Sequence, residues 1–206
     1  METELILYMK REVRIEWEYD GKPDFSSGTG AYASEKALGL LSALVVPLIL
    51  LYVLWQKDPG WSVVEWIVAM VIALDISGGL VSNALNSCKR FYHTPPKREE
   101  GKLGVWLKHP VLFTVCHVHP IIVYWVFDDK NWLLGLLWYG LLLGSAAMVL
   151  SVPLYLRRPV SMLLIMICIL TNFYGIEPVP LFEWLMPLLF IKIVYGHLVR
   201  EEPYRK

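Results

Sequence analysis

Residues 61–93 read WSVVEWIVAMVIALDISGGLVSNALNSCKRFYH, a long apolar run that ends among polar and basic side chains. About 20 helical residues are enough to cross the roughly 30 Å hydrocarbon layer of a membrane. Asp75 interrupts the apolar run, and a carboxylate at that depth is costly unless it faces a partner, a cavity or a substrate path. The stretch therefore predicts a membrane-spanning helix that carries functional polar groups.

The composition of the whole chain agrees with a membrane protein. Of its 206 residues, 56% are hydrophobic and 18% are charged, and nine Trp and eleven Tyr suit the two membrane interfaces. The net charge is zero, so nothing suggests a nucleic-acid partner, and membrane lipid is the expected partner, with a second copy of the chain as a further candidate. The three cysteines, Cys88, Cys116 and Cys168, have no paired spacing and do not indicate a disulfide framework.

The hydrophobic pattern predicts an all-α, polytopic integral membrane bundle of about six transmembrane helices. We expect an N-terminal cytoplasmic or interfacial segment over 1–35, the membrane domain over 36–199 and a cytoplasmic tail over 200–206. The six predicted spans are 36–55, 61–88, 109–127, 131–154, 159–174 and 180–199.

Basic residues give the expected orientation. Sixteen of the nineteen Lys and Arg residues fall on one side of this six-span layout, whereas Lys57 and Lys130 fall on the other. Because cytoplasmic loops carry the excess of basic residues, both termini should be cytoplasmic, as in a multi-pass protein of the cell membrane. Before the first span, Ile6, Met9, Val13 and Trp17 recur at helical spacing, which predicts an amphipathic helix on the membrane surface. Alternation from Val13 to Tyr19 leaves a strand as the alternative.

The second span carries a predicted polar stripe. At about 3.6 residues per turn, six polar or small residues fall near one face of a continuous helix. They are Asp75, Gly79, Ser82, Asn86, Arg90 and His93. One interpretation is helix packing, since small residues allow close approach of another helix. The other is a binding site, in which Ser82, Asn83, Asn86, Lys89, Arg90 and His93 hold a substrate with an anionic group.

Two histidines lie in the third span, at 117 and 119. Residues two apart on an ideal helix point about 200° apart, so both reach one site only if the helix is broken. Pro120 supplies a reason for a break, because proline removes a backbone hydrogen bond. Asp75, His117 and His119 are the candidate catalytic residues, as groups that move a proton.

The same residue types could also bind a metal. Asp75, His93, His117 and His119 are candidate ligands from two neighbouring spans, with zinc, iron or manganese as the candidate cofactor. The spacing contains no established metal-binding motif, and an intramembrane histidine can equally hydrogen-bond a neighbouring helix.

Three functions remain open from the sequence. The first is an enzyme or binding protein for an anionic, lipid-derived or amphipathic molecule, with its site on the second and third spans and open to the cytoplasm. The second is a transporter or channel for protons or a small ion. The third is a non-catalytic subunit that docks a cytoplasmic partner through its N-terminal helix and loop 94–108.

Overall fold

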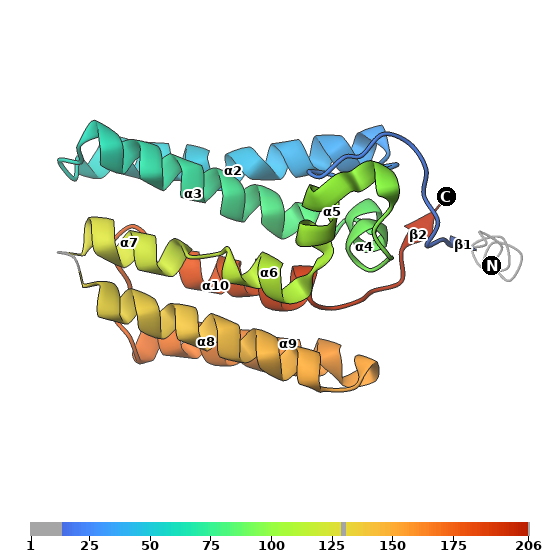
Figure 1. The fold of residues 1–206 in the computed structure, drawn as a ribbon. Helices are drawn as coiled ribbons and strands as arrows, with labels where there is room; N and C mark the ends of the chain where they lie inside the picture. Colours follow the sequence, from blue (N-terminus) through green and yellow to red (C-terminus); the bar gives the residue numbers. More distant parts are fainter. Residues whose placement is uncertain (1–13, 129–130, 206) are drawn as a thin grey trace, which may run out of the picture.

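The computed structural model describes residues 14–128 and 131–205, which form an α-helical bundle. Five helical segments are long and apolar enough to cross a membrane. They are α2 (Ala33–Lys57), α3 (Val63–Ser82), α6 (Pro110–Val115) continued by α7 (His119–Phe127), α8 (Trp132–Ser151) and α9 (Leu154–Tyr174). Figure 1 shows them running side by side along the molecule. The prediction of an all-α membrane bundle is confirmed.

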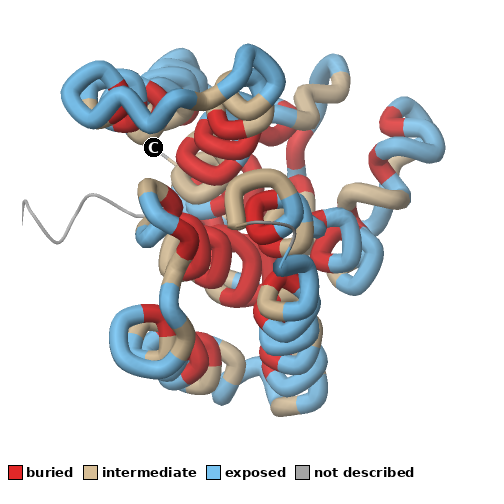
Figure 2. Tube along the Cα trace, turned by 90° about the vertical axis from the view of Figure 1, so that its left-hand side faces the viewer, coloured by how far each residue is buried: buried red, intermediate tan, exposed pale blue. Residues whose placement is uncertain are grey.

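The sixth predicted span is shorter and forms the centre of the bundle. Over 180–199 the chain forms α10 (Leu185–Phe190), which continues into the π-helical η2 (Ile191–His197). Leu185, Leu189 and Ile193 are fully buried, and Figure 2 shows the buried residues concentrated in the middle of the molecule. This segment therefore makes the core against which the outer helices pack.

The outer helix α2 shows the opposite pattern. It packs against α3, and aliphatic side chains such as Leu40, Leu41 and Leu48 are at least 60% exposed. A helix that is apolar all round and exposed in this way suits contact with lipid chains.

Short elements cover one end of the bundle. They are β1 (Arg14–Ile15), α4 (Asn86–Tyr92), the 3₁₀ turn η1 (Arg98–Glu100), α5 (Gly101–Lys108) and β2 (Tyr204–Arg205). β1 pairs antiparallel with β2, so the two ends of the described chain meet at this end (Figure 1).

A buried polar cluster joins this covering layer together. The Tyr19 hydroxyl donates to Glu100 Oε1 at 2.5 Å and accepts from Lys108 Nζ at 2.7 Å, while Lys108 and Glu100 form an ion pair at 2.8 Å. Loop 94–108, expected as an exposed docking segment, is therefore partly folded against the segment around Tyr19 that precedes α2.

The structure changes two sequence-based predictions. Most of the predicted surface helix lies in residues 1–13, outside the described residues, but Arg14 to Tyr19 are not helical. Their backbone bonds to the C-terminal tail instead, as in the 3.0 Å bond from Glu16 N to Pro203 O.

The second predicted span also ends earlier than expected, at Ser82 rather than at residue 88. Asn83 caps the C-terminus of α3, and its side-chain amide donates to the Lys192 carbonyl at 3.1 Å. Extended backbone at Leu85 then starts α4 in a new direction. The predicted stripe is therefore divided between two helices.

Candidate functional site

A break in the third membrane segment brings two histidines to one place. α6 ends at Val115 and α7 begins at His119, with Pro120 in its first turn. His117 and His119 both line the same cavity, and their ring centroids are 5.4 Å apart. The helix is thus broken next to Pro120, and of the two arrangements left open by the sequence, the one that brings both imidazoles together is present.

Asp75 is the centre of this site. Its Oδ2 accepts from Lys192 Nζ at 2.5 Å and lies 3.2 Å from His119 Nε2. Lys192 also donates to the Asp75 carbonyl oxygen at 3.0 Å. An N–H at His119 Nε2 would donate to Oδ2, since a carboxylate oxygen accepts hydrogen bonds. The group is thus a Lys192–Asp75–His119 cluster drawn from three helical segments.

The neighbouring residues make room for the Lys192 side chain. A Cβ on Gly79 would lie 2.3 Å from Lys192 Cε and 2.8 Å from Nζ, so any larger residue there would require the Lys192 side chain to move. Lys192 lies at the start of the π-helical turn, a backbone irregularity that is frequent at functional sites. The Lys192 side chain is only 2% exposed.

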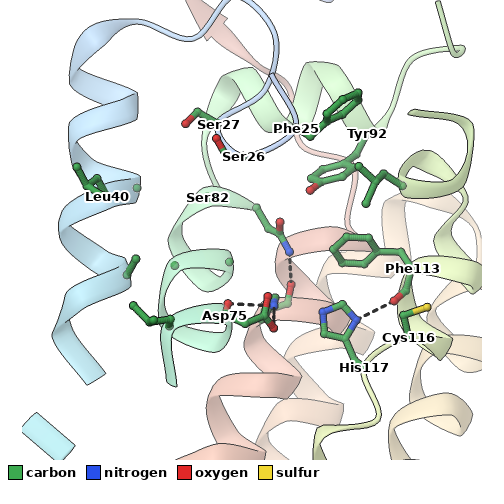
Figure 3. Close-up of a pocket in the computed structure, with 18 of the residues that line it drawn as sticks. Phe25, Ser26, Ser27, Leu40, Asp75, Ser82, Tyr92, Phe113, Cys116 and His117 are labelled. Atoms are coloured by element: carbon green, nitrogen blue, oxygen red, sulfur yellow. Dashed lines mark hydrogen bonds and ion pairs between the residues drawn. The ribbon is translucent and has the colours of Figure 1, made fainter. Parts of the chain in front are cut away.

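Asp75 faces a cavity of about 610 Å³ rather than the packed core. Its side chain is 46% exposed, whereas the Lys192 side chain that pairs with it is buried. Figure 3 shows Asp75, Ser82 and His117 around this space, with Leu40 on the α2 side and Phe113 and Cys116 opposite. The lining contains both polar and apolar groups: Phe25, Ser26, Ser27, Lys36, Gly39, Leu40, Ala43, Leu74, Asp75, Gly78, Gly79, Ser82, Asn83, Tyr92, Trp106, Leu107, Phe113, Cys116, His117, His119 and Lys192.

The cavity extends toward the end of the bundle that carries the chain termini. Ser26, Ser27 and Lys36 line it near that end, and Ser82 lies seven residues from Asp75 along α3. At 1.5 Å per residue, Asp75 is therefore about 10 Å deeper than the end of its helix. The cavity thus joins a polar covering layer to a charged group at membrane depth.

An aromatic cluster fills the opposite end of the bundle. Trp61 lies 4.8 Å from Phe127 and 5.9 Å from Phe182 between ring centroids, and the two Phe rings are 4.6 Å apart. None of these three residues lines the cavity. This arrangement favours access to Asp75 from the termini end or from the side.

The predicted substrate-binding residues separate into different places. Ser82 and Asn83 line the cavity with Asp75. Asn86 and Lys89 line a second pocket of about 600 Å³ beside Arg200, and Lys89 Nζ donates to the carbonyls of Gly196 and Val199. The expectation that Lys89, Arg90 and His93 hold one anionic group together with Asn83 is therefore not supported by their positions, because the helix breaks between Asn83 and Asn86.

Arg90 and His93 line neither pocket. Arg90 is fully buried, and none of its three guanidinium nitrogens has a hydrogen-bond partner within the described part of the chain. Burial, together with the nearby positive charges of Lys89, Arg200 and Arg157, lowers the pKa of His93 to about 3. His93 is thus a neutral, half-buried side chain at neutral pH.

The candidate metal ligands do not converge. Across residues 14–128 and 131–205, no group of three or more His, Cys, Asp or Glu side chains is arranged to hold a metal ion. Asp75 Oδ2 is shared by Lys192 and His119, and His117 Nδ1 lies 2.7 Å from the Phe113 carbonyl oxygen. The predicted zinc, iron or manganese site therefore receives no support.

No family model, curated protein or solved structure matches this chain. The geometry of the cavity therefore carries the functional argument. The residue that sequence reasoning missed is Lys192, which lies in the sixth predicted span and outside both the stripe and the histidine pair. The available signal was charge balance, since a lone intramembrane Asp and a lone intramembrane Lys can neutralise each other.

Proposed function

We propose that this chain is an integral membrane protein that binds an amphipathic molecule in the cavity at Asp75. In this function the Asp75–His119 pair positions a polar group of the ligand and exchanges a proton with it. The observation that carries the proposal is a half-exposed carboxylate facing a cavity about 10 Å inside a membrane-spanning helix. Although Lys192 pairs with this carboxylate, its exposed part favours a polar occupant beside it, either water or the polar part of a ligand.

The lining of the cavity supports an amphipathic ligand. Apolar side chains such as Leu40, Leu74 and Phe113 alternate around the space with the polar groups of Ser82 and Asn83. Ligand sites generally combine an apolar wall with a few polar groups that fix orientation. Proton exchange is supported by the contact between His119 Nε2 and Asp75 Oδ2, since a carboxylate beside an imidazole fixes its orientation and stabilises the imidazolium.

We further propose that the termini end of the bundle faces the cytoplasm. This assignment rests on the basic residues of the covering layer and of the first turn of α9, such as Arg98, Arg157 and Arg200. It would place the polar end of the cavity at the cytoplasmic interface.

A proton path is the second candidate function. Its support is a set of buried imidazole nitrogens without partners among the described residues: His93 Nε2, His119 Nδ1 and His197 Nδ1. Buried polar atoms of this kind are commonly bridged by internal water, which can relay protons. The aromatic cluster of Trp61, Phe127 and Phe182 lies between Asp75 and the opposite end, and this favours a site with one opening.

Lipid analysis of purified variants tests the proposed function. Leu74→Trp adds bulk to the cavity wall without touching the charged cluster, and Leu74 is 42% exposed, so the variant should fold. Leu133→Trp is the matched control, because Leu133 lies on α8, is 63% exposed and does not line the cavity. Each protein would be purified in mild detergent and its bound lipids quantified by mass spectrometry.

We expect one amphipathic species to accompany the wild type and the control at about one molecule per chain, and to be depleted about tenfold by Leu74→Trp. Identical lipid contents in the three proteins would contradict ligand binding in the cavity. A proton flux into vesicles that depends on His197, with no retained ligand, would favour the second candidate.

A further inference from the structure

The cavity opens sideways at the depth of the membrane. Leu40 on α2 is 68% exposed, Leu74 on α3 is 42% exposed and Cys116 beyond α6 is exposed, and all three line the cavity. These residues lie on helices of spanning length, so their exposed surfaces are in contact with lipid chains. A molecule dissolved in the bilayer would therefore approach Asp75 between α2 and the α6–α7 break. Figure 3 shows Leu40 on α2 and Cys116 on opposite sides of Asp75.

The α2–α3 contact supports this opening on one side. A Cβ on Gly78 would lie 3.0 Å from Ala43 Cβ, and one on Gly39 would lie 3.0 Å from Ser82 Oγ. The two helices are thus packed closely along the cavity wall, and α2 is held against α3 rather than against α6. The opening between α2 and the α6–α7 break therefore results from the packing of α2 against α3.

Charges inside the cavity indicate what the ligand carries. Both lysines that line it are paired: Lys192 with Asp75 at 2.5 Å and Lys36 with Asp24 at 2.9 Å. A ligand phosphate or carboxylate would bring a second negative charge close to Asp75 with no free lysine to balance it. A cationic ligand would meet an aspartate whose charge Lys192 already neutralises.

The free atom at the deep end is a hydrogen-bond acceptor. Lys192 and His119 both approach Asp75 Oδ2, whereas no residue in the described ranges donates to Oδ1. A carboxylate oxygen with vacant lone pairs in a low-dielectric region gains most from a donor group. A hydroxyl supplies that donor without adding charge.

We propose that the ligand of this cavity is a neutral lipid bearing a hydroxyl group, which enters from the bilayer between α2 and the α6–α7 break. This inference rests on the proposed function and narrows its substrate class. The hydroxyl donates to Asp75 Oδ1, and the hydrocarbon lies along Leu40 and Leu74. The anionic group expected from the sequence is thereby replaced by an uncharged one.

Photolabelling in vesicles tests both parts of the proposal. The full chain in phosphatidylcholine vesicles would be exposed to three diazirine probes with the same long alkyl chain, ending in a hydroxyl, a carboxylate or a trimethylammonium group. Labelled peptides would be located by mass spectrometry. Cys116 provides a native gate probe, because Cys88 and Cys168 are buried and a bulky maleimide should react at Cys116.

We expect the alcohol probe to label cavity residues about tenfold more than either charged probe, a difference of about 1.4 kcal/mol in binding. Alkylation of Cys116 should reduce this labelling about tenfold in the wild type and leave it unchanged in Cys116→Ser. Equal or stronger labelling by a charged probe would overturn the substrate class, and labelling insensitive to Cys116 alkylation would overturn the entry route. If either of these results is found while Leu74→Trp still depletes a bound lipid, the proposed function stands and only the substrate class or the entry route is wrong.

Discussion

Lys192 Nζ lies 2.5 Å from Asp75 Oδ2, although 117 positions separate the two residues in the chain. The contact joins the central helix to α3 and neutralises two charges at membrane depth. It also leaves Asp75 Oδ1 without a donor among the residues that the structure describes. A single ion pair therefore supports both the packing of the bundle and the proposed binding site.

Asp75→Asn should destabilise the protein. The substitution leaves the buried Lys192 ammonium without its counter-charge, and breaking a buried pair from one side costs about 3 kcal/mol. Thermal unfolding in detergent would show a lower midpoint for Asp75→Asn and a partial recovery in Asp75→Asn/Lys192→Met, where both charges are gone. Asp128→Asn is the matched control, because Asp128 caps the C-terminal end of α7 and does not line the cavity. Equal midpoints for wild type and Asp75→Asn would show that the ion pair contributes no stability.

Gly79→Ala should separate Lys192 from Asp75. Its Cβ would lie 2.3 Å from Lys192 Cε, so the lysine must move, at a cost of about 2 kcal/mol. Gly140→Ala is a sharp control, because a Cβ there has no neighbour within 4 Å and alanine favours a helix. In chemical denaturation, the free energy of unfolding of Gly140→Ala should equal or exceed that of wild type, and that of Gly79→Ala should be lower. The reverse order would contradict the close contact at Gly79.

His93 should make the protein sensitive to acid. Its pKa is lowered to about 3 in the folded protein, whereas an unfolded histidine titrates near its ordinary value of about 6.5. The unfolded state therefore takes up a proton first as the pH falls, so the stability due to neutral His93 is present above about pH 6.5 and is lost progressively toward pH 3.

Between pH 6.5 and pH 5 this loss should amount to about 1.6 kcal/mol. Denaturation at several pH values should give a smaller slope for His93→Gln than for wild type. His109→Gln serves as the control, because His109 is an exposed histidine. The prediction fails if His93→Gln and wild type have parallel pH dependences.

Tyr19→Phe should loosen the covering layer and spare the bundle. The hydroxyl bridges Glu100 and Lys108, and its removal should cost about 1 kcal/mol locally. Limited trypsin digestion should then cut faster after Lys22, while thermal unfolding of the helices changes little. Tyr174→Phe, in which the ring is 87% exposed, should digest like wild type. An unchanged rate of cleavage after Lys22 in Tyr19→Phe would mean that the Tyr19–Glu100–Lys108 cluster does not hold the segment before α2 in place.

Much of the bundle follows from the sequence, because hydrophobic length alone defines a membrane helix. Residues 33–57 and 132–151 are helical close to where the apolar runs predict them. The central helix was harder to predict. It is apolar like the others, and only tertiary packing shows that 185–197 is short and buried.

The parts of the candidate site that depend on neighbouring residues in the sequence could be predicted. Asp75 and the break near Pro120 could be identified from one residue and its immediate neighbours. The prediction that the polar stripe continues beyond Ser82 was wrong, because helical spacing assumes a continuous helix. Instead α3 ends there, and the Asn83 side chain donates to the Lys192 carbonyl of the central helix. The Lys192 partnership needs knowledge of which helices are adjacent, and no single stretch of sequence supplies that.

The most direct test of the central claim is a high-resolution cryo-EM map of the chain in a lipid nanodisc, with a bound antibody fragment as a fiducial. We predict elongated density along Leu40 and Leu74 that ends within hydrogen-bond distance of Asp75 Oδ1. A cavity that contains only water, or one closed by α2 against α6, would contradict the proposal that Asp75 binds a lipid-borne polar group.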